Sequence, residues 1–167
     1  MSGVPTWSRR TPEEAALLNP AFLALVVHQA TQTFQEESGV GLPFPMAFLV
    51  PPVVLAETIR SQLPDRKDSS LAAWIQGHPQ VRLRFAEHAA AMTPLVREGV
   101  LFALRTGVLS LVETRLRALP LRRGVNHAIM GNTDEFKEIV KKTKFVGRWY
   151  ANAGTTETIM ALWGVRP

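Results

Sequence analysis

The chain contains no cysteine, and this absence excludes several kinds of site at once. Without thiols there is no thiol nucleophile, no cysteine-based zinc site and no disulfide, which suits a reducing cytosol. A long apolar run is also missing. The most apolar stretch, residues 42–56, is shorter than the ~20 residues of a membrane helix and is interrupted by prolines. We therefore expect a cytoplasmic protein that makes no membrane contact.

Recognisable catalytic motifs are missing as well. The sequence has no phosphate-binding glycine loop, no nucleophile elbow and no His-Glu-x-x-His pair, and its four histidines lie far apart. These absences favour a protein without catalytic residues or a cofactor. The first ten residues have no signal-peptide core. We expect residues 1–10 to be a flexible N-terminal segment and residues 11–167 to form one helical domain.

The most metal-like group is His28, Gln32, Gln35 and Glu36, which share one side of a predicted helix. Glutamines are poor metal ligands, and no second cluster supplies the remaining positions. The alternative is a polar stripe that packs against backbone groups or faces solvent. We favour this alternative and expect no metal site, although an enzyme with an unfamiliar site around His28 and Glu36 remains a third hypothesis.

The net charge of +5 is unevenly distributed. Residues 1–96 carry 7 Lys/Arg and 8 Asp/Glu, or −1, whereas residues 97–167 carry 12 and 6, or +6. This excess gives the C-terminal part a preference for acidic partners. The alternative is a general bias toward arginine, since the chain has 14 arginines and 5 lysines.

Caps and apolar spacing predict a mainly helical, compact domain. A capping box at residues 11–14 indicates a first helix start. Further helices are predicted at residues 20–38, after Pro52 to residue 63, and at residues 71–76, 79–92, 93–107, 133–153 and 156–164. Residues 108–119 alternate with period two around Glu113 and Thr114 and predict a small β-hairpin. Three short helices before a hairpin suggest a winged helix, although any helix-helix-hairpin segment would match this order.

Two groups of basic residues are candidates for nucleic-acid binding. Arg115 and Arg117 lie on one face of the predicted hairpin, opposite Leu116, and could contact phosphates. The alternative is an edge strand protected by charge. The full candidate set combines the hairpin region with a basic stripe on helix 133–153: Arg115, Arg117, Arg122, Arg123, Lys137, Lys141, Lys144 and Arg148.

Three aromatic residues are candidates for partner binding. Phe145 and Trp149 fall outside the stripe of helix 133–153 that should face the core, and Trp163 lies close to the end of the chain. Either the apolar segment 159–163 folds back over the pair, or a partner covers it. We favour internal docking of this tail, with a partner bound along its outer edge.

Five segments stand out as a candidate family signature: NPAFLAL (residues 19–25), QEESG (35–39), LPFPMAFLV (42–50), FVGRWY (145–150) and ALWGVRP (161–167). Together they resemble the middle component family of three-component ABC systems. The resemblance covers nearly the whole chain and is weakest around residues 108–135.

This resemblance implies a bacterial operon of three genes that acts against phage or other foreign DNA. Its partners would be an ABC ATPase related to SMC and Rad50 proteins and a third, effector-type component. The middle component would be a non-catalytic adaptor, similar in role to the small winged-helix subunits of SMC complexes. The competing hypothesis is a free-standing, winged-helix-like DNA-binding protein.

Overall fold

The computed structural model describes residues 18–66, 68–125 and 133–166. Its elements in chain order are α2 (Pro20–Ser38), β1 (Leu42–Pro43), the 3-10 helix η2 (Phe44–Phe48), α3 (Val50–Leu55), α4 (Glu57–Arg60), α5 (Leu71–Gly77), α6 (Pro79–Arg105), β2 (Leu109–Val112), β3 (Arg115–Ala118), α8 (Asp134–Ala151) and α9 (Thr156–Leu162). The predicted mainly helical class with a small hairpin is confirmed. The predicted capping box at residues 11–14 and the segment 1–10 lie outside the described residues.

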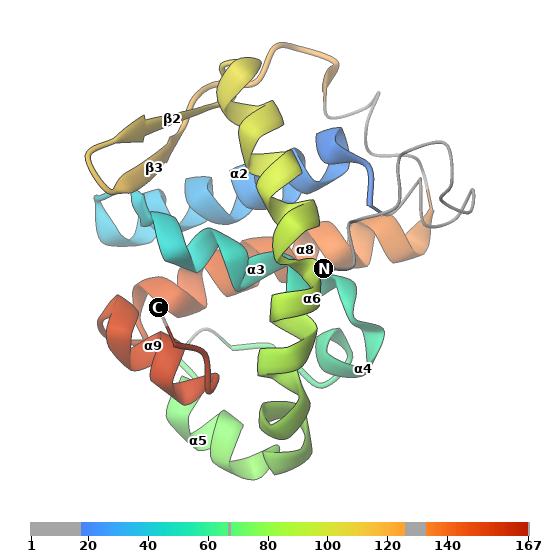
Figure 1. Ribbon diagram of the computed structural model, residues 1–167, viewed down its shortest axis with the longest axis vertical. Helices are drawn as coiled ribbons and strands as arrows, with labels where there is room; N and C mark the ends of the chain where they lie inside the picture. The colour runs from blue at the N-terminus through green and yellow to red at the C-terminus, as the bar shows by residue number, and fades with distance from the viewer. Residues whose placement is uncertain (1–17, 67, 126–132, 167) are drawn as a thin grey trace.

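Helix α2 has its predicted bounds and forms the centre of the molecule (Figure 1). Its start is capped by the Asn19 side chain, whose Oδ1 accepts the Ala21 N–H at 2.8 Å. Gly39, with a φ of 77°, ends it in the left-handed conformation that glycine tolerates. Every residue from 22 to 31 is buried, because α6 and α8 pack on different sides of this helix.

Two glycines allow α6 and α8 to approach α2 closely. A Cβ at Gly99 of α6 would lie 2.5 Å from the Leu23 Cβ. A Cβ at Gly147 of α8 would collide with the Ala30 carbonyl oxygen and the Thr33 hydroxyl. Real Cβ atoms do not approach other atoms so closely. Because glycine has no side chain, Gly99 and Gly147 allow the short distances between the three helices.

The sheet is antiparallel, with the strand order β1-β3-β2. The predicted hairpin is confirmed: β2 and β3 pair with Leu111 opposite Leu116 and turn at Glu113 and Thr114. Strand β1 is absent from the sequence prediction, because two residues, one of them proline, carry no period-two signal. It pairs with the other edge of β3, with Leu42 opposite Leu116, so β3 is the middle strand.

The predicted break at Thr93 and Pro94 is wrong, because α6 is one helix of 27 residues that contains Pro94. The Thr93 hydroxyl does not cap a new helix; it donates to the Ala89 carbonyl at 2.9 Å, within the same helix. Pro94 and Ala90 are exposed, so the carbonyl that proline leaves without its usual partner can be hydrated. The predicted order of three helices between residue 71 and the hairpin is therefore wrong, because this range contains two, α5 and α6.

The predicted helix after Pro52 begins earlier, at Val50. Pro51 and Pro52 occupy the first turn, where an N–H has no intrahelical partner and proline is tolerated. The helix also ends earlier, because Ala56 is extended and separates α3 from α4.

Arg60 stabilises the break between α3 and α4. Its side chain is 2% exposed. The Nη1 donates to the carbonyl of Val54 at 2.9 Å, which provides a partner for the free carbonyls at the end of α3. The other guanidinium nitrogens lie 3.5 Å from Glu135 and 3.4 Å from Glu138 of α8. Arg60 thus joins α3, α4 and α8.

Candidate functional site

The three candidate partner-binding aromatics are buried in the core. Phe145, Trp149 and Trp163 are 6%, 1% and 0% exposed. The C-terminal segment docks internally, but on Phe85 of α6: the centroids of the Trp163 and Phe85 rings are 4.2 Å apart. The centroids of the Trp149 and Phe145 rings are 5.3 Å apart. No large part of these three side chains is available at the surface in this conformation.

Trp149 is covered by α5 and by the loop before it, rather than by the tail as predicted. Its Nε1 donates to the Ser69 carbonyl at 2.6 Å, and its ring meets the Trp74 ring edge-on at 5.7 Å. Ser69 and Trp74 belong to the loop before α5 and to α5 itself. The loop before α5 and α5 itself therefore cover Trp149, and the periodicity of α8 alone gives no signal for this contact.

The predicted basic stripe of α8 lies largely at the surface. Lys137, Lys141 and Lys144 are exposed, and Arg148 is half-buried. Lys137 lies 3.5 Å from Asp134, one turn earlier on the same helix. This stripe is therefore accessible, and Asp134 partly offsets the charge at its start.

The hairpin displays its arginines as predicted. Arg115 and Arg117 are exposed, whereas Leu116 between them is buried on the opposite face. Arg115 also holds the sheet together, because its Nη1 donates to the Gly41 carbonyl at 2.9 Å. The interpretation of a charge-protected edge is wrong, since β3 is the middle strand and lies between β1 and β2. Arg122 and Arg123 are exposed beyond the hairpin.

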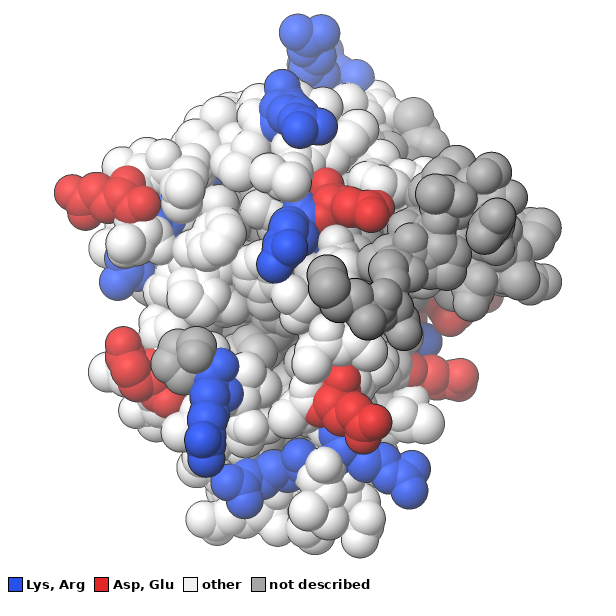
Figure 2. All heavy atoms as spheres, viewed as in Figure 1, with Lys and Arg blue, Asp and Glu red and all other residues white. Residues whose placement is uncertain are grey.

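Basic side chains do not form one continuous field on the face that Figure 2 shows. Lys and Arg lie near the end of α6 and again around its start, and Asp and Glu are interspersed between them. A mixed surface of this kind gives a weaker long-range attraction for nucleic acid than a field of one sign.

The polar residues of α2 support the end of the hairpin. The Nε2 of His28 lies 2.7 Å from the Leu119 carbonyl, and the Gln35 Oε1 accepts the Ala118 N–H at 2.7 Å. Burial lowers the pKa of His28, which favours the neutral ring, while the bond to Leu119 opposes that shift. Gln32 and Glu36 are exposed beside a hollow of about 530 Å³. Among the described residues, no three acidic or histidine side chains converge as metal ligands.

A wide apolar groove lies between α5, the start of α6 and α9, hereafter the tail groove. Its volume is about 940 Å³, and apolar side chains dominate its lining: Ile75, Pro79, Leu83, Ala86, Ala161 and Leu162. Leu83 is 74% exposed. Arg82 donates from Nε to the Leu162 carbonyl at 3.1 Å, which joins α6 to the end of α9.

The tail groove runs along the outer edge of the docked C-terminal segment. Sequence reasoning missed its residues, because they come from three helices whose contact is set by the tertiary fold. One local signal does exist. Leu83 stands between Arg82 and Arg84 in the sequence and is an isolated large apolar residue there.

Comparison with known proteins gives one match. The family model described as "ABC-three component (ABC-3C) system Middle Component 3" matches residues 7–167. No curated protein and no solved structure matches the chain. Among the described residues, no helix combines the length and the apolar character that a membrane crossing requires.

Proposed function

Because the chain belongs to the Middle Component 3 family of ABC-three component systems, we propose that it is a non-catalytic adaptor. The adaptor would link an ABC ATPase of the SMC and Rad50 type to a third, effector-type component of the same operon. The system would act in defence against phage or other foreign DNA. The family match over nearly the whole chain carries this proposal.

The tail groove is the proposed docking site for the ATPase. Its apolar lining and the exposure of Leu83 suit an amphipathic helix, which inserts apolar side chains spaced one turn apart. Arg82 lines the groove beside Leu83 and is exposed. A partner helix with an apolar stripe and an acidic flank would complement both the groove and this charge.

A charge placed in the groove tests this assignment. Leu83→Glu should weaken binding of the ATPase more than tenfold, because a carboxylate in an apolar interface is desolvated without a partner. The matched control is Leu101→Glu on the same helix, where the side chain is 43% exposed but outside the groove. The groove is refuted if both variants bind the ATPase equally well. Failure of the parent protein to bind either component would refute the adaptor role itself.

A second candidate function is DNA binding through the hairpin. The observation that favours it is the exposure of Arg117 and Arg115 on the outer face of a small sheet that follows a long helix. Retention of DNA by several such contacts would weaken steeply as salt rises. Replacing both arginines with glutamate should then abolish retention, whereas ATPase binding through the tail groove would persist. Retention that is unchanged in this variant would exclude the hairpin as the contact.

A further inference from the structure

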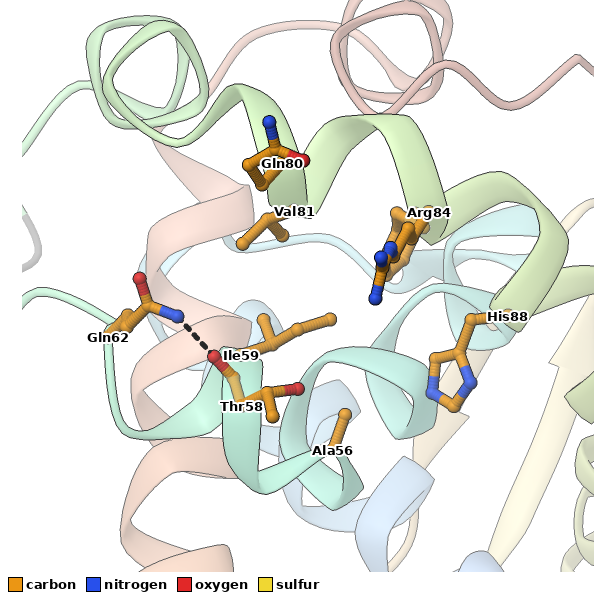
Figure 3. Close-up of a pocket in the computed structure, with 9 residues that line it drawn as sticks. Ala56, Thr58, Ile59, Gln62, Gln80, Val81, Arg84 and His88 are labelled. Carbon is orange, nitrogen blue, oxygen red and sulfur yellow. Dashed lines mark hydrogen bonds between the residues drawn. The ribbon is translucent and has the colours of Figure 1, made fainter.

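A pocket of about 550 Å³ lies between α4 and the first half of α6, on the side of α6 away from the tail groove (Figure 3). Its apolar part consists of Ile59, Val81 and Phe85, of which Ile59 and Phe85 are 7% and 0% exposed. These side chains belong to the hydrophobic core or pack against it. The base of the pocket is therefore fixed in place by the fold rather than by mobile surface groups.

A guanidinium and an imidazole approach the pocket from α6. Arg84 and His88 are four residues apart, so they share one face of the helix. Figure 3 shows both directed toward the space beside α4, with Thr58 on the opposite wall. In the part of the chain that the structure describes, no acidic residue lines the pocket. Among the described residues, no carboxylate pairs with Arg84.

The His88 ring adds a second observation. Its Nε2 is buried and has no hydrogen-bond partner among the described residues. Buried polar atoms without a partner are uncommon in native proteins, and such an atom beside a cavity calls for a ligand or a water molecule. With the proton on Nε2, the ring would donate into the same space as the Arg84 guanidinium.

We propose that this pocket binds a small amphipathic anion. An apolar body would lie on Ile59, Val81 and Phe85, and a carboxylate or phosphate head would accept hydrogen bonds from Arg84 and His88. A cation would be repelled by Arg84, and a purely apolar ligand would leave His88 Nε2 without a partner. The proposal does not depend on the adaptor role, because it uses a different side of α6.

The test is a titration of the full-length protein followed by ¹H–¹⁵N NMR, with octanoate, octyl phosphate and 1-octanol as probes. The three share one alkyl chain and differ in the head group. At least one anionic probe should shift the amides of residues 56–62 and 80–88 and bind at least tenfold more tightly than 1-octanol. The tighter of the two anions identifies the head group.

Arg84→Gln should weaken binding of that anion about tenfold and leave 1-octanol unaffected, because only the charge contact is removed. Arg97→Gln is the control, since Arg97 is exposed on the same helix outside the pocket. Three results would overturn the proposal: equal affinity for the anions and 1-octanol, shifts that map elsewhere, or no saturable binding of either anion.

Discussion

The C-terminal segment and the hairpin are both candidates for contact with other molecules in the sequence, and the fold treats them in opposite ways. The aromatic rings of α8 and the tail are buried, whereas the arginines of β3 remain exposed. The difference follows from the cost of solvation. Covering an apolar ring with a neighbouring segment stabilises the folded state. Burying a guanidinium destabilises the folded state unless a charge partner is buried with it. An aromatic residue outside the main face of a helix therefore indicates a second internal contact before it indicates a partner.

The largest expected effect comes from removing the ring that anchors the tail. Trp163→Ala should lower the free energy of unfolding by about 3–5 kcal/mol, since it deletes a fully buried ring packed on Phe85. Urea unfolding measures this loss. Trp163→Phe, which keeps an aromatic ring there, should cost clearly less. A normal melt combined with lost partner binding would mean that the tail faces a partner and that the comparison is wrong.

A second effect tests whether α8 belongs to the core as closely as the structure indicates. Gly147→Ala should cost about 2–3 kcal/mol, because the added methyl group meets the backbone of α2. Gly77→Ala provides a control, since a Cβ there has no neighbour within 4 Å. We expect that control to stay within about 0.5 kcal/mol of the parent protein. Equal melting temperatures for the two variants would contradict the close packing.

A smaller effect concerns the pH dependence of stability through His28, which contacts the end of the hairpin. The pKa of His28 is lowered in the folded state, so the unfolded chain binds a proton more readily below the ordinary value of 6.5. Stability should therefore be complete above that pH and decline as the pH falls below it. His28→Gln should flatten this decline in urea unfolding curves recorded between about pH 7.5 and about pH 5. A decline of unchanged steepness would show that other groups cause it.

The smallest effects are expected at the arginines of the hairpin. Arg117→Ala should change stability by less than about 0.5 kcal/mol, as is usual for an exposed side chain. Arg115→Ala should cost slightly more, because it removes the hydrogen bond to Gly41 that joins β1 to β3. Thermal melts of the two variants compare the stability cost of the two substitutions, both of which lie on β3. A cost of several kcal/mol at Arg117 would mean that the hairpin is not the solvent-exposed region described here.

The elements with local signals are those that can be predicted from the sequence. Helix α2 has a capping asparagine and a terminating glycine, α8 and α9 each follow a threonine cap, and the hairpin has alternating residues around a two-residue turn. The Thr133 and Thr155 hydroxyls accept the N–H groups of Phe136 and Thr158, respectively, and so cap the starts of these two helices.

Features set by distant parts of the chain could not be predicted in this way. Pro94 is a helix breaker by its local chemistry, yet α6 continues through it because Met92 and Val96 on either side are buried. The pairing of β1 with β3 joins residues more than seventy positions apart and depends on the close approach of two backbones. The tail groove and the α4–α6 pocket arise from helix packing, for which periodicity gives no signal.

The central claim is that this chain bridges an ABC ATPase and a third component, and reconstitution of the three proteins tests it most directly. The three should be mixed pairwise and together and separated by size-exclusion chromatography with light scattering. The account predicts that the ATPase and the third component co-elute only when this chain is present, and that Leu83→Glu abolishes the ternary peak while Leu101→Glu preserves it. Co-elution of the ATPase and the third component without this chain, or no complex containing it, would contradict the account.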